Sequence, residues 1–180
     1  MARLVYLMGA SGVGKDTLLG EARRRHPGWL VAHRYVTRES GLSENSVALT
    51  HDEFAFRQST GLFCLSWEAH GLSYGLGIEL EAWLCRDATV LVNGSRRALP
   101  DAQCRFGDWL LPVLVTAPEG LLRQRLMNRG RETQEVIEDR LLRHRQLAAS
   151  LPDVAHIDNA GTPQASLDEL SRLVEVRCST

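Results

Sequence analysis

The chain has 180 residues, of which 44% are hydrophobic and 24% charged, and its formal net charge is −1. This length fits a single domain with a real core, and the balanced charge excludes a general affinity for polyanions, so we expect no nucleic-acid partner. The four cysteines are widely spaced without a Cys-x-x-Cys pair, which argues against a disulfide framework or a zinc site. No apolar run is long enough for a signal peptide or a membrane span. We expect a cytoplasmic protein without membrane contact; the composition leaves the oligomeric state open.

In chain order, the hydrophobic pattern predicts strands and helices that alternate. The expected strands are residues 4–8, 29–36, 62–67, 89–94, 109–116 and 154–157. The expected helices are residues 17–26, a segment from residue 50, 78–86, 118–128, 132–150 and 163–177. Such alternation predicts an α/β fold with a central parallel sheet of about five strands and helices on both faces. Residues 37–45 are expected as a polar loop and residues 70–77 as a glycine-punctuated turn.

The most informative motif joins the first expected strand to the first expected helix. It reads Gly9-Ala10-Ser11-Gly12-Val13-Gly14-Lys15-Asp16-Thr17, which is the pattern of a phosphate-binding loop. Its glycines let main-chain N–H groups surround a phosphate at a helix N-terminus, and the lysine charge reaches the outer phosphates. A glycine-rich turn with an incidental lysine is the alternative interpretation.

Composition strengthens the phosphate-loop interpretation. Lys15 is the only lysine, and the other 20 of the 21 basic residues are arginines. A guanidinium is too wide for the place of the loop lysine, so arginine does not replace it there. Asp16 is irregular, because the motif expects Ser or Thr on magnesium at this position.

Several arginines lie where a phosphoryl-transfer enzyme needs cations. Arg129 and Arg131 flank a break between two expected helices, and Arg140 follows about two turns later. A lid that bends at such a break could bring cations onto a migrating phosphoryl group. Arg38 and Arg96 come shortly after expected strands, where ligands bind in open α/β sheets. For most other arginines a solvated helix face is the simpler explanation.

The kind of acceptor follows from a residue type that is missing. A kinase that acts on a hydroxyl usually keeps an aspartate near the acceptor. No aspartate follows the second expected strand, where Arg34, Thr37 and Arg38 stand instead. A phosphate nucleophile is already ionised at neutral pH and needs no base. The sequence therefore favours transfer onto a phosphate, which gives a diphosphate.

At this point the chain resembles the guanylate-kinase group of P-loop kinases over almost its whole length. The supporting motifs are the loop ending at Lys15, Thr37-Arg38, Gly71-x-x-Tyr74-Gly75, Arg125-Leu126-x-x-Arg129-Gly130, Arg140-Leu141 and Asn159. The resemblance implies one domain, residues 1–180, with an acceptor-binding segment at about 33–80 and a lid at about 128–145. It also implies that the Thr-Arg segment and the Tyr-Gly turn hold the acceptor, and that Asn159 lies by the adenine of ATP.

The departures from that group point to a narrower family. Ser40 to Leu42 stand where a second acceptor arginine is expected, no clear base-reading acid precedes the Tyr-Gly turn, and Asn93 replaces an aspartate. The motifs Val31-Ala32-His33-Arg34-Tyr35-Val36-Thr37-Arg38, Ser43-Glu44-Asn45, Leu65-Ser66-Trp67, Tyr74-Gly75-Leu76-Gly77 and Leu91-Val92-Asn93-Gly94-Ser95-Arg96 resemble the ribose 1,5-bisphosphate phosphokinase family of bacterial phosphonate breakdown. Members of that family use ATP to make 5-phosphoribosyl 1-diphosphate.

The resemblance implies the following site. ATP is held by Gly9, Ala10, Ser11, Gly12, Val13, Gly14, Lys15, Asp16, Thr17 and Asn159. Ribose 1,5-bisphosphate is held by Arg38, Glu44, Tyr74, Asn93 and Arg96, and transfer is promoted by Lys15, Arg129, Arg131 and Arg140. Asp16 is the candidate residue for Mg²⁺, taking over part of the role of the carboxylate missing at position 93.

Alternatives remain for single residues and for the whole chain. Tyr74 is also compatible with a packed turn tyrosine, Glu44 with a solvated loop acid, and Asn93 with satisfying main-chain groups. A guanylate or other nucleoside monophosphate kinase needs a base-reading carboxylate, for which only Glu44 or Glu68 is available. A guanylate-kinase-like binding module without catalysis is expected to lose the loop glycines or Lys15, and this chain keeps them.

Overall fold

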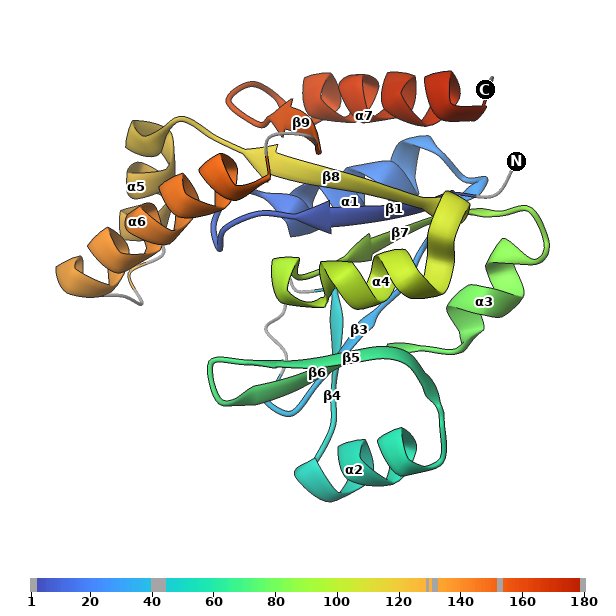
Figure 1. Cartoon of the computed structure of the whole chain (residues 1–180). Coiled ribbons are helices and arrows are strands. Elements are labelled where there is room, and N and C mark those ends of the chain that lie inside the picture. The colour runs from blue at the N-terminus through green and yellow to red at the C-terminus, as the bar shows by residue number, and fades with distance from the viewer. Residues whose placement is uncertain (1–2, 40–44, 129, 131–132, 152–153, 179–180) are drawn as a thin grey trace.

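Two sheets divide the chain between them (Figure 1). The structure is a computed structural model that describes residues 3–39, 45–128, 130, 133–151 and 154–178. The central sheet has five parallel strands in the order β2-β7-β1-β8-β9. They span β1 Arg3–Met8, β2 Trp29–Val31, β7 Thr89–Asn93, β8 Leu110–Thr116 and β9 Ala155–Asp158.

The core lies on both faces of this sheet. Every residue of β1 is buried, and its side chains alternate between two apolar clusters. Val5 and Leu7 join the cluster under helices α1 Lys15–Arg25 and α7 Pro163–Cys178. Leu4 and Tyr6 join the cluster under α3 Glu79–Leu84 and α4 Leu99–Phe106. Short 3₁₀ turns at Arg96–Ala98 and Gly107–Trp109 flank α4. Burial on both faces explains why the central strands read as continuous apolar runs.

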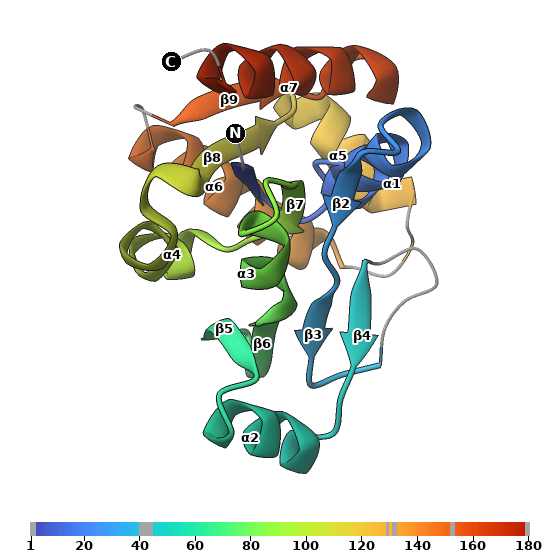
Figure 2. The same cartoon turned by 90° about the vertical axis from the view of Figure 1, so that its right-hand side faces the viewer.

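A second, smaller sheet lies below the central one in Figures 1 and 2. Its strand order is β4-β3-β6-β5, with bounds β3 Arg34–Val36, β4 Ser46–Ala48, β5 Phe63–Ala69 and β6 Leu72–Gly77. β5 and β6 form a hairpin whose turn residues His70 and Gly71 have φ values of 55° and 72°. Positive φ at both positions is the geometry of a two-residue type I′ turn.

Helix α2, His51–Ser59, covers the outer face of the second sheet. The Thr50 hydroxyl accepts a hydrogen bond from the Glu53 main-chain N–H at 3.1 Å, so Thr50 is the N-cap that the sequence predicts. Phe54 packs on Phe63 of β5 with ring centroids 4.7 Å apart. The opposite face of the sheet contributes Leu65 and Leu76 to the cluster that contains Tyr6.

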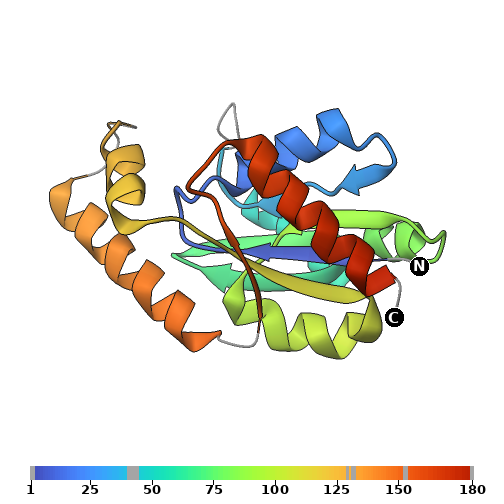
Figure 3. The same cartoon turned by 90° about the horizontal axis from the view of Figure 1, so that it is seen from above.

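Two helices form an arm at one end of the central sheet (Figure 3). They are α5, Glu119–Asn128, and α6, Gln134–Ser150. Ion pairs of Arg123 with Glu138 and of Arg145 with Glu119 join the two helices. Ile137 and Leu141 of α6 pack into the same core as α5. The expected lid therefore begins and ends in regular helices.

The predicted α/β class and five-stranded parallel sheet are confirmed, but three local predictions are wrong. Residues 29–36 are not one strand: β2 pairs with β7 in the central sheet, whereas β3 pairs with β4 and β6 in the second. Residues 70–77 are mostly strand β6 and not a turn. Helix α4 was not expected; Pro100 lies in its first turn, where proline is tolerated. No helix in the described part of the chain is long and apolar enough to cross a membrane.

Candidate active site at the carboxyl end of the central sheet

The phosphate-loop motif lies between β1 and α1, as expected for its function. Gly9, Gly12 and Gly14 have φ values of 148°, 93° and 98°, which residues with a side chain rarely adopt. A Cβ at Gly14 would stand 2.3 Å from the side-chain nitrogen of Asn159, so this position also needs glycine for space. Lys15 Nζ donates to the carbonyl oxygens of Gly9 and Ala10 at 2.7 and 3.1 Å. The lysine is thus held over the loop at the N-terminus of α1, where the helix dipole favours anions.

Asn159 ties the end of the last strand to this loop. Its Nδ2 donates to the Val13 carbonyl oxygen at 2.6 Å, and its Oδ1 accepts from the Ser166 hydroxyl at 2.7 Å. Arg125 of α5 donates to the same Val13 oxygen at 3.2 Å and to the Asn159 carbonyl oxygen at 3.0 Å. Both side-chain ends of Asn159 are therefore engaged in shaping the loop.

A pocket of about 340 Å³ opens beside the loop. It is lined by Gly12, Gly14, Thr17, Arg125, Asn128, Asn159, Gly161 and Pro163. The pocket adjoins the loop that would hold the phosphates, so it lies where the rest of a nucleotide would extend. Asn159 belongs to this pocket wall, in line with the expectation that it lies near adenine.

Asp16 and Asn93 meet in front of α1. Asn93 ends β7 and is only 4% exposed, and its Nδ2 lies 3.4 Å from Asp16 Oδ1. Asn93 Oδ1 is buried without a hydrogen-bond partner among the residues that the structure describes. The main-chain N–H of Asn45, just before β4, also points at Asp16 Oδ1 at 3.5 Å. One carboxylate and one unsatisfied amide oxygen therefore face the phosphate loop together.

These oxygens fit the needs of a magnesium ion bound with a nucleotide. Mg²⁺ usually keeps several waters and takes one or two carboxylates plus phosphate oxygens, not a cage made by the protein alone. Among the described residues, no group of three or more His, Cys, Asp or Glu side chains is arranged to hold a metal. Asp16 with Asn93 is thus a partial donor set, suited to an ion that phosphates also hold.

Thr37 and Arg38 are fastened to the hairpin of the second sheet. The Thr37 hydroxyl accepts from the Ser73 N–H at 2.9 Å, and the Thr37 N–H donates to the Ser73 carbonyl oxygen at 3.1 Å. Arg38 follows, partly exposed, with Nη1 donating to the Glu39 carbonyl oxygen at 2.9 Å. The Thr-Arg segment and Tyr74 therefore belong to one sheet, since Val36 pairs with Tyr74.

Tyr74 lies in an aromatic stack that faces the central sheet. Its ring stacks on Trp67 with centroids 5.6 Å apart and planes at 12°. The guanidinium carbon of Arg34 lies 4.8 Å from the Tyr74 ring centroid. Arg34 and Trp67 were not among the committed site residues, because their proximity to Tyr74 depends on strand pairing between distant segments. Their only sequence signal is their place in the family-like motifs.

Arg96 and the lid residues are placed less centrally. Arg96 is exposed, and its Nη1 donates to the Ser150 hydroxyl at the end of α6 at 2.9 Å. Arg140 lies three residues after the buried Ile137 and four before the buried His144, on the helix face that packs inward. His144 Nε2 is 3.0 Å from the Ala117 carbonyl oxygen. Glu44, Arg129 and Arg131 lie outside the described residues.

Comparison with known proteins places this geometry in a family. No family model matches the chain. A ribose 1,5-bisphosphate phosphokinase PhnN of Pectobacterium parmentieri is 45% identical over 177 residues, covering 97% of this chain and 94% of that protein. The namesakes from Desulfomicrobium baculatum and Achromobacter xylosoxidans are 47% and 52% identical over 89% and 81% of this chain, and 88% and 77% of their own length.

A solved structure supports the fold independently. The crystal structure of guanylate kinase from Anaplasma phagocytophilum superposes with a TM-score of 0.74, covering 97% of this chain and 85% of that one, at 17% identity. At this identity the match speaks for the fold alone. With relatives near half-identical over most of its length and a complete phosphate loop, this chain belongs to the ribose 1,5-bisphosphate phosphokinase family.

Proposed function

We propose that this chain transfers the γ-phosphate of ATP to the 1-phosphate of ribose 1,5-bisphosphate, giving 5-phosphoribosyl 1-diphosphate and ADP in phosphonate catabolism. The observation that carries the proposal is the 45–52% identity to proteins of that name over 81–97% of the chain. The phosphate loop with Lys15 supports the use of ATP. The arginines of the second sheet support an acceptor that brings its own negative charge.

The nucleotide is held by the loop from Gly9 to Thr17 and by the pocket that Asn159 lines. Main-chain N–H groups of the loop and the start of α1 surround the β-phosphate. The Lys15 ammonium moves from its present carbonyl partners onto the phosphate oxygens, which attract it more strongly because they are charged. The adenine enters the pocket beside Arg125.

The acceptor lies between the two sheets, held by segment 33–80. Arg38, Tyr74, Asn93 and Arg96 line its path, with Glu44 completing the set. Arg129, Arg131 and Arg140 of the lid, residues about 128–145, neutralise the migrating group as the 1-phosphate attacks in line. No general base is required, because the attacking phosphate oxygen carries no proton at neutral pH.

Asp16 and Asn93 would hold Mg²⁺ with the nucleotide. The ion supplies positive charge to the β- and γ-phosphate oxygens. The chain's own contribution is to orient Asp16, whose carboxylate oxygen is fixed by the Asn93 amide and the Asn45 N–H.

Product analysis tests the proposal directly. The enzyme is supplied with MgATP and, separately, ribose 1,5-bisphosphate, GMP and other nucleoside monophosphates, and the products are identified by mass. We expect 5-phosphoribosyl 1-diphosphate with the sugar bisphosphate, and a Lys15→Ala variant with unchanged circular dichroism should be inactive. Robust GDP formation without the phosphoribosyl product would establish a nucleoside monophosphate kinase instead. Binding of nucleotide without any turnover would establish a non-catalytic module.

A further inference from the structure

The inference concerns Arg34, the first residue of β3. Directly paired residues in a sheet point to the same face. Arg34 pairs with Leu76, which pairs with Leu65, and Leu65 and Leu76 both pack into the cluster that contains Tyr6. The Arg34 side chain therefore leaves the second sheet on the face that looks at the central sheet.

The guanidinium is held in place there by stacking. It covers the Tyr74 ring at 4.8 Å, and Tyr74 is 9% exposed and stacked in turn on Trp67. Stacking on an aromatic face suits arginine, because its planar group keeps its N–H donors free around the edge. A donor fork that is already oriented loses little freedom when it binds a phosphate.

Arg34 also reaches toward the loop after β7. Its charge opposes the effect of burial, which raises the pKa of Tyr6 to about 12, so the guanidinium and the phenol feel each other's field. Tyr6 Oη accepts from the Ser95 N–H and donates to the Ser95 carbonyl oxygen, both at 2.9 Å. Ser95 stands between Asn93 and Arg96, so Arg34 faces the acceptor-side loop from across the cleft.

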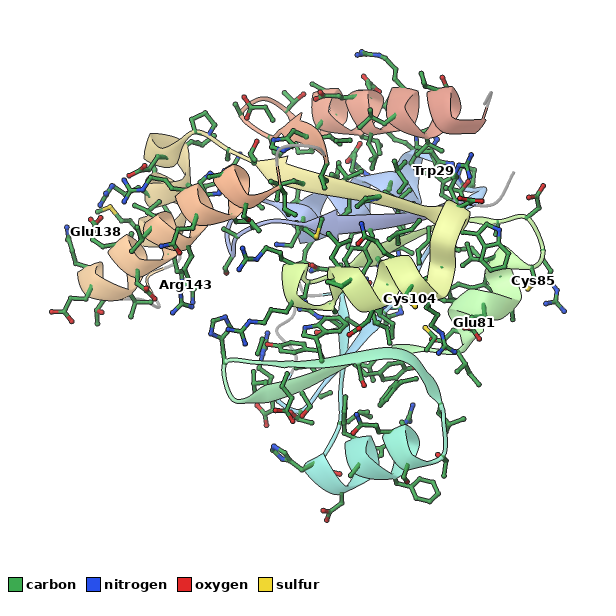
Figure 4. All side chains as sticks on the ribbon, in the orientation of Figure 1. Trp29, Glu81, Cys85, Cys104, Glu138 and Arg143 are labelled. Carbon is green, nitrogen blue, oxygen red and sulfur yellow. The ribbon has the colours of Figure 1, made fainter. Side chains whose placement is uncertain are left out.

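The two arginines of β3 and its extension lie at opposite ends of this cleft. Thr37, next to Arg38, is bonded to Ser73 of the hairpin, and the hairpin tip His70 lies 3.4 Å from Arg143 of α6. Figure 4 shows Arg143 on α6, on the side toward the hairpin. The Arg38 end is therefore beside the lid helix, where transfer takes place. Arg34 lies at the other end, next to the residues that join the two sheets.

We infer that Arg34 binds the phosphate of the acceptor that does not react, the 5-phosphate of the sugar bisphosphate. This rests on the proposed function and adds the residue that selects an acceptor with two phosphates. Four residues of extended chain separate Arg34 from Arg38, roughly 13 Å between Cα atoms. That separation lets two arginine forks reach the two ends of one sugar bisphosphate. Arg34 fixes the distal end, while Arg38 and the lid act on the reacting end.

The test uses acceptors that lack one phosphate or the other. Binding of ribose 1,5-bisphosphate, ribose 1-phosphate and ribose 5-phosphate is measured by calorimetry in the presence of a non-hydrolysable ATP analogue. Arg34→Gln should weaken the bisphosphate and ribose 5-phosphate by roughly 10- to 100-fold. It should leave ribose 1-phosphate and the ATP analogue unchanged. Arg34→Lys, which keeps the charge without the planar fork, should fall between.

Two further variants make the result specific. Arg57 stacks on Tyr35 at 5.0 Å on the opposite face of the same sheet, so Arg57→Gln removes a similar cation and should change no acceptor affinity. Arg38→Gln should show the reverse preference, weakening ribose 1-phosphate and sparing ribose 5-phosphate. Thermal unfolding and retained binding of the ATP analogue show that each variant is folded.

The outcomes separate this inference from the proposed function. Equal loss of affinity for all three acceptors, loss for ribose 1-phosphate alone, or no loss in Arg34→Gln would overturn the role of Arg34. A parent enzyme that binds the bisphosphate no more tightly than ribose 1-phosphate would overturn it as well. A parent that binds the bisphosphate through Arg34 but forms no phosphoribosyl diphosphate would refute the activity and leave the binding role standing.

Discussion

Asn93 Nδ2 lies 3.4 Å from Asp16 Oδ1, so the two positions at which this chain departs from the usual phosphate-loop kinase pattern contact each other. One position has gained a carboxylate and the other has an amide in place of one. Asn93 Oδ1, buried and without a partner among the described residues, stands beside that carboxylate. The pair therefore behaves as one exchanged unit and not as two independent changes.

Exchanging the two residue types should show this coupling. Asp16→Thr removes the only carboxylate of the pair, and Asn93→Asp places two carboxylates in contact, which disfavours ionisation of both. We expect each single variant to lose roughly 10- to 100-fold in transfer rate, with a higher Mg²⁺ requirement. The double variant should recover part of that loss. The measurements are kcat and the Mg²⁺ concentration for half-maximal rate.

The exposed Asp168 on α7 provides the control, because Asp168→Asn removes a carboxylate that pairs with Arg25 far from the loop. It should change neither quantity. A double variant as slow as the slower single variant would mean that the two positions act separately.

Asn159 should matter for stability as well as for nucleotide binding. Asn159→Ala removes the bonds to Val13 and Ser166 in a buried site, and we expect a loss of about 2–3 kcal/mol in the free energy of unfolding. Urea unfolding measures it. Asn128→Ala, an exposed asparagine in the same pocket, should cost less than about 0.5 kcal/mol. Equal costs for the two variants would argue against the loop-tying role.

Acid should weaken the ion pair that joins α5 to α6. Arg123 holds the pKa of the Glu138 carboxyl below its ordinary value, so the stabilisation is present above the unfolded pKa of about 4.3 and is lost as pH falls through the lower folded pKa. Glu138, labelled on α6 in Figure 4, is exposed, so salt should reduce the effect. Glu138→Gln should flatten the acid-side fall of the unfolding temperature, and Arg123→Gln should remove the same slope. Additive effects in the double variant would contradict a direct pair.

Thiol reactivity should separate the cysteines of the described chain. Burial raises the pKa of Cys64 to about 12, and its Sγ donates to the carbonyl oxygens of Leu76 and Gly77. Since the thiolate is the reactive form, an alkylating reagent at about pH 8 should leave Cys64 unlabelled. The exposed Cys85 and Cys104, labelled in Figure 4, should react. Peptide mass analysis before and after denaturation measures the difference; Cys64 labelled as fast as Cys104 in the folded protein would contradict this prediction.

Much of the central sheet could be predicted from the sequence, because its strands are buried on both faces and read as unbroken apolar runs. The phosphate loop could be predicted as well, since its chemistry depends on residues adjacent in the chain. The division of residues 29–36 could not, because only pairing with distant partners assigns Val31 to one sheet and Arg34 to the other. Local preference is the same on both sides of that boundary.

Strand β6 was hidden by its glycines. A Cβ at Gly75 would stand 2.8 Å from the Phe63 ring, so this glycine permits close packing within a sheet and does not mark a turn. The site showed the same limit: Tyr74 was expected from its motif, whereas Arg34 and Trp67 come beside it only through the register of β3, β6 and β5. Contacts made across strands leave no local pattern.

The single lysine has a practical consequence. Because Lys15 is the only lysine and its ammonium contacts the loop carbonyls, protein grown with isotope-labelled lysine carries one side-chain magnetic-resonance signal, located at the phosphate site. That signal would follow the arrival of each nucleotide phosphate in solution, without any probe being attached.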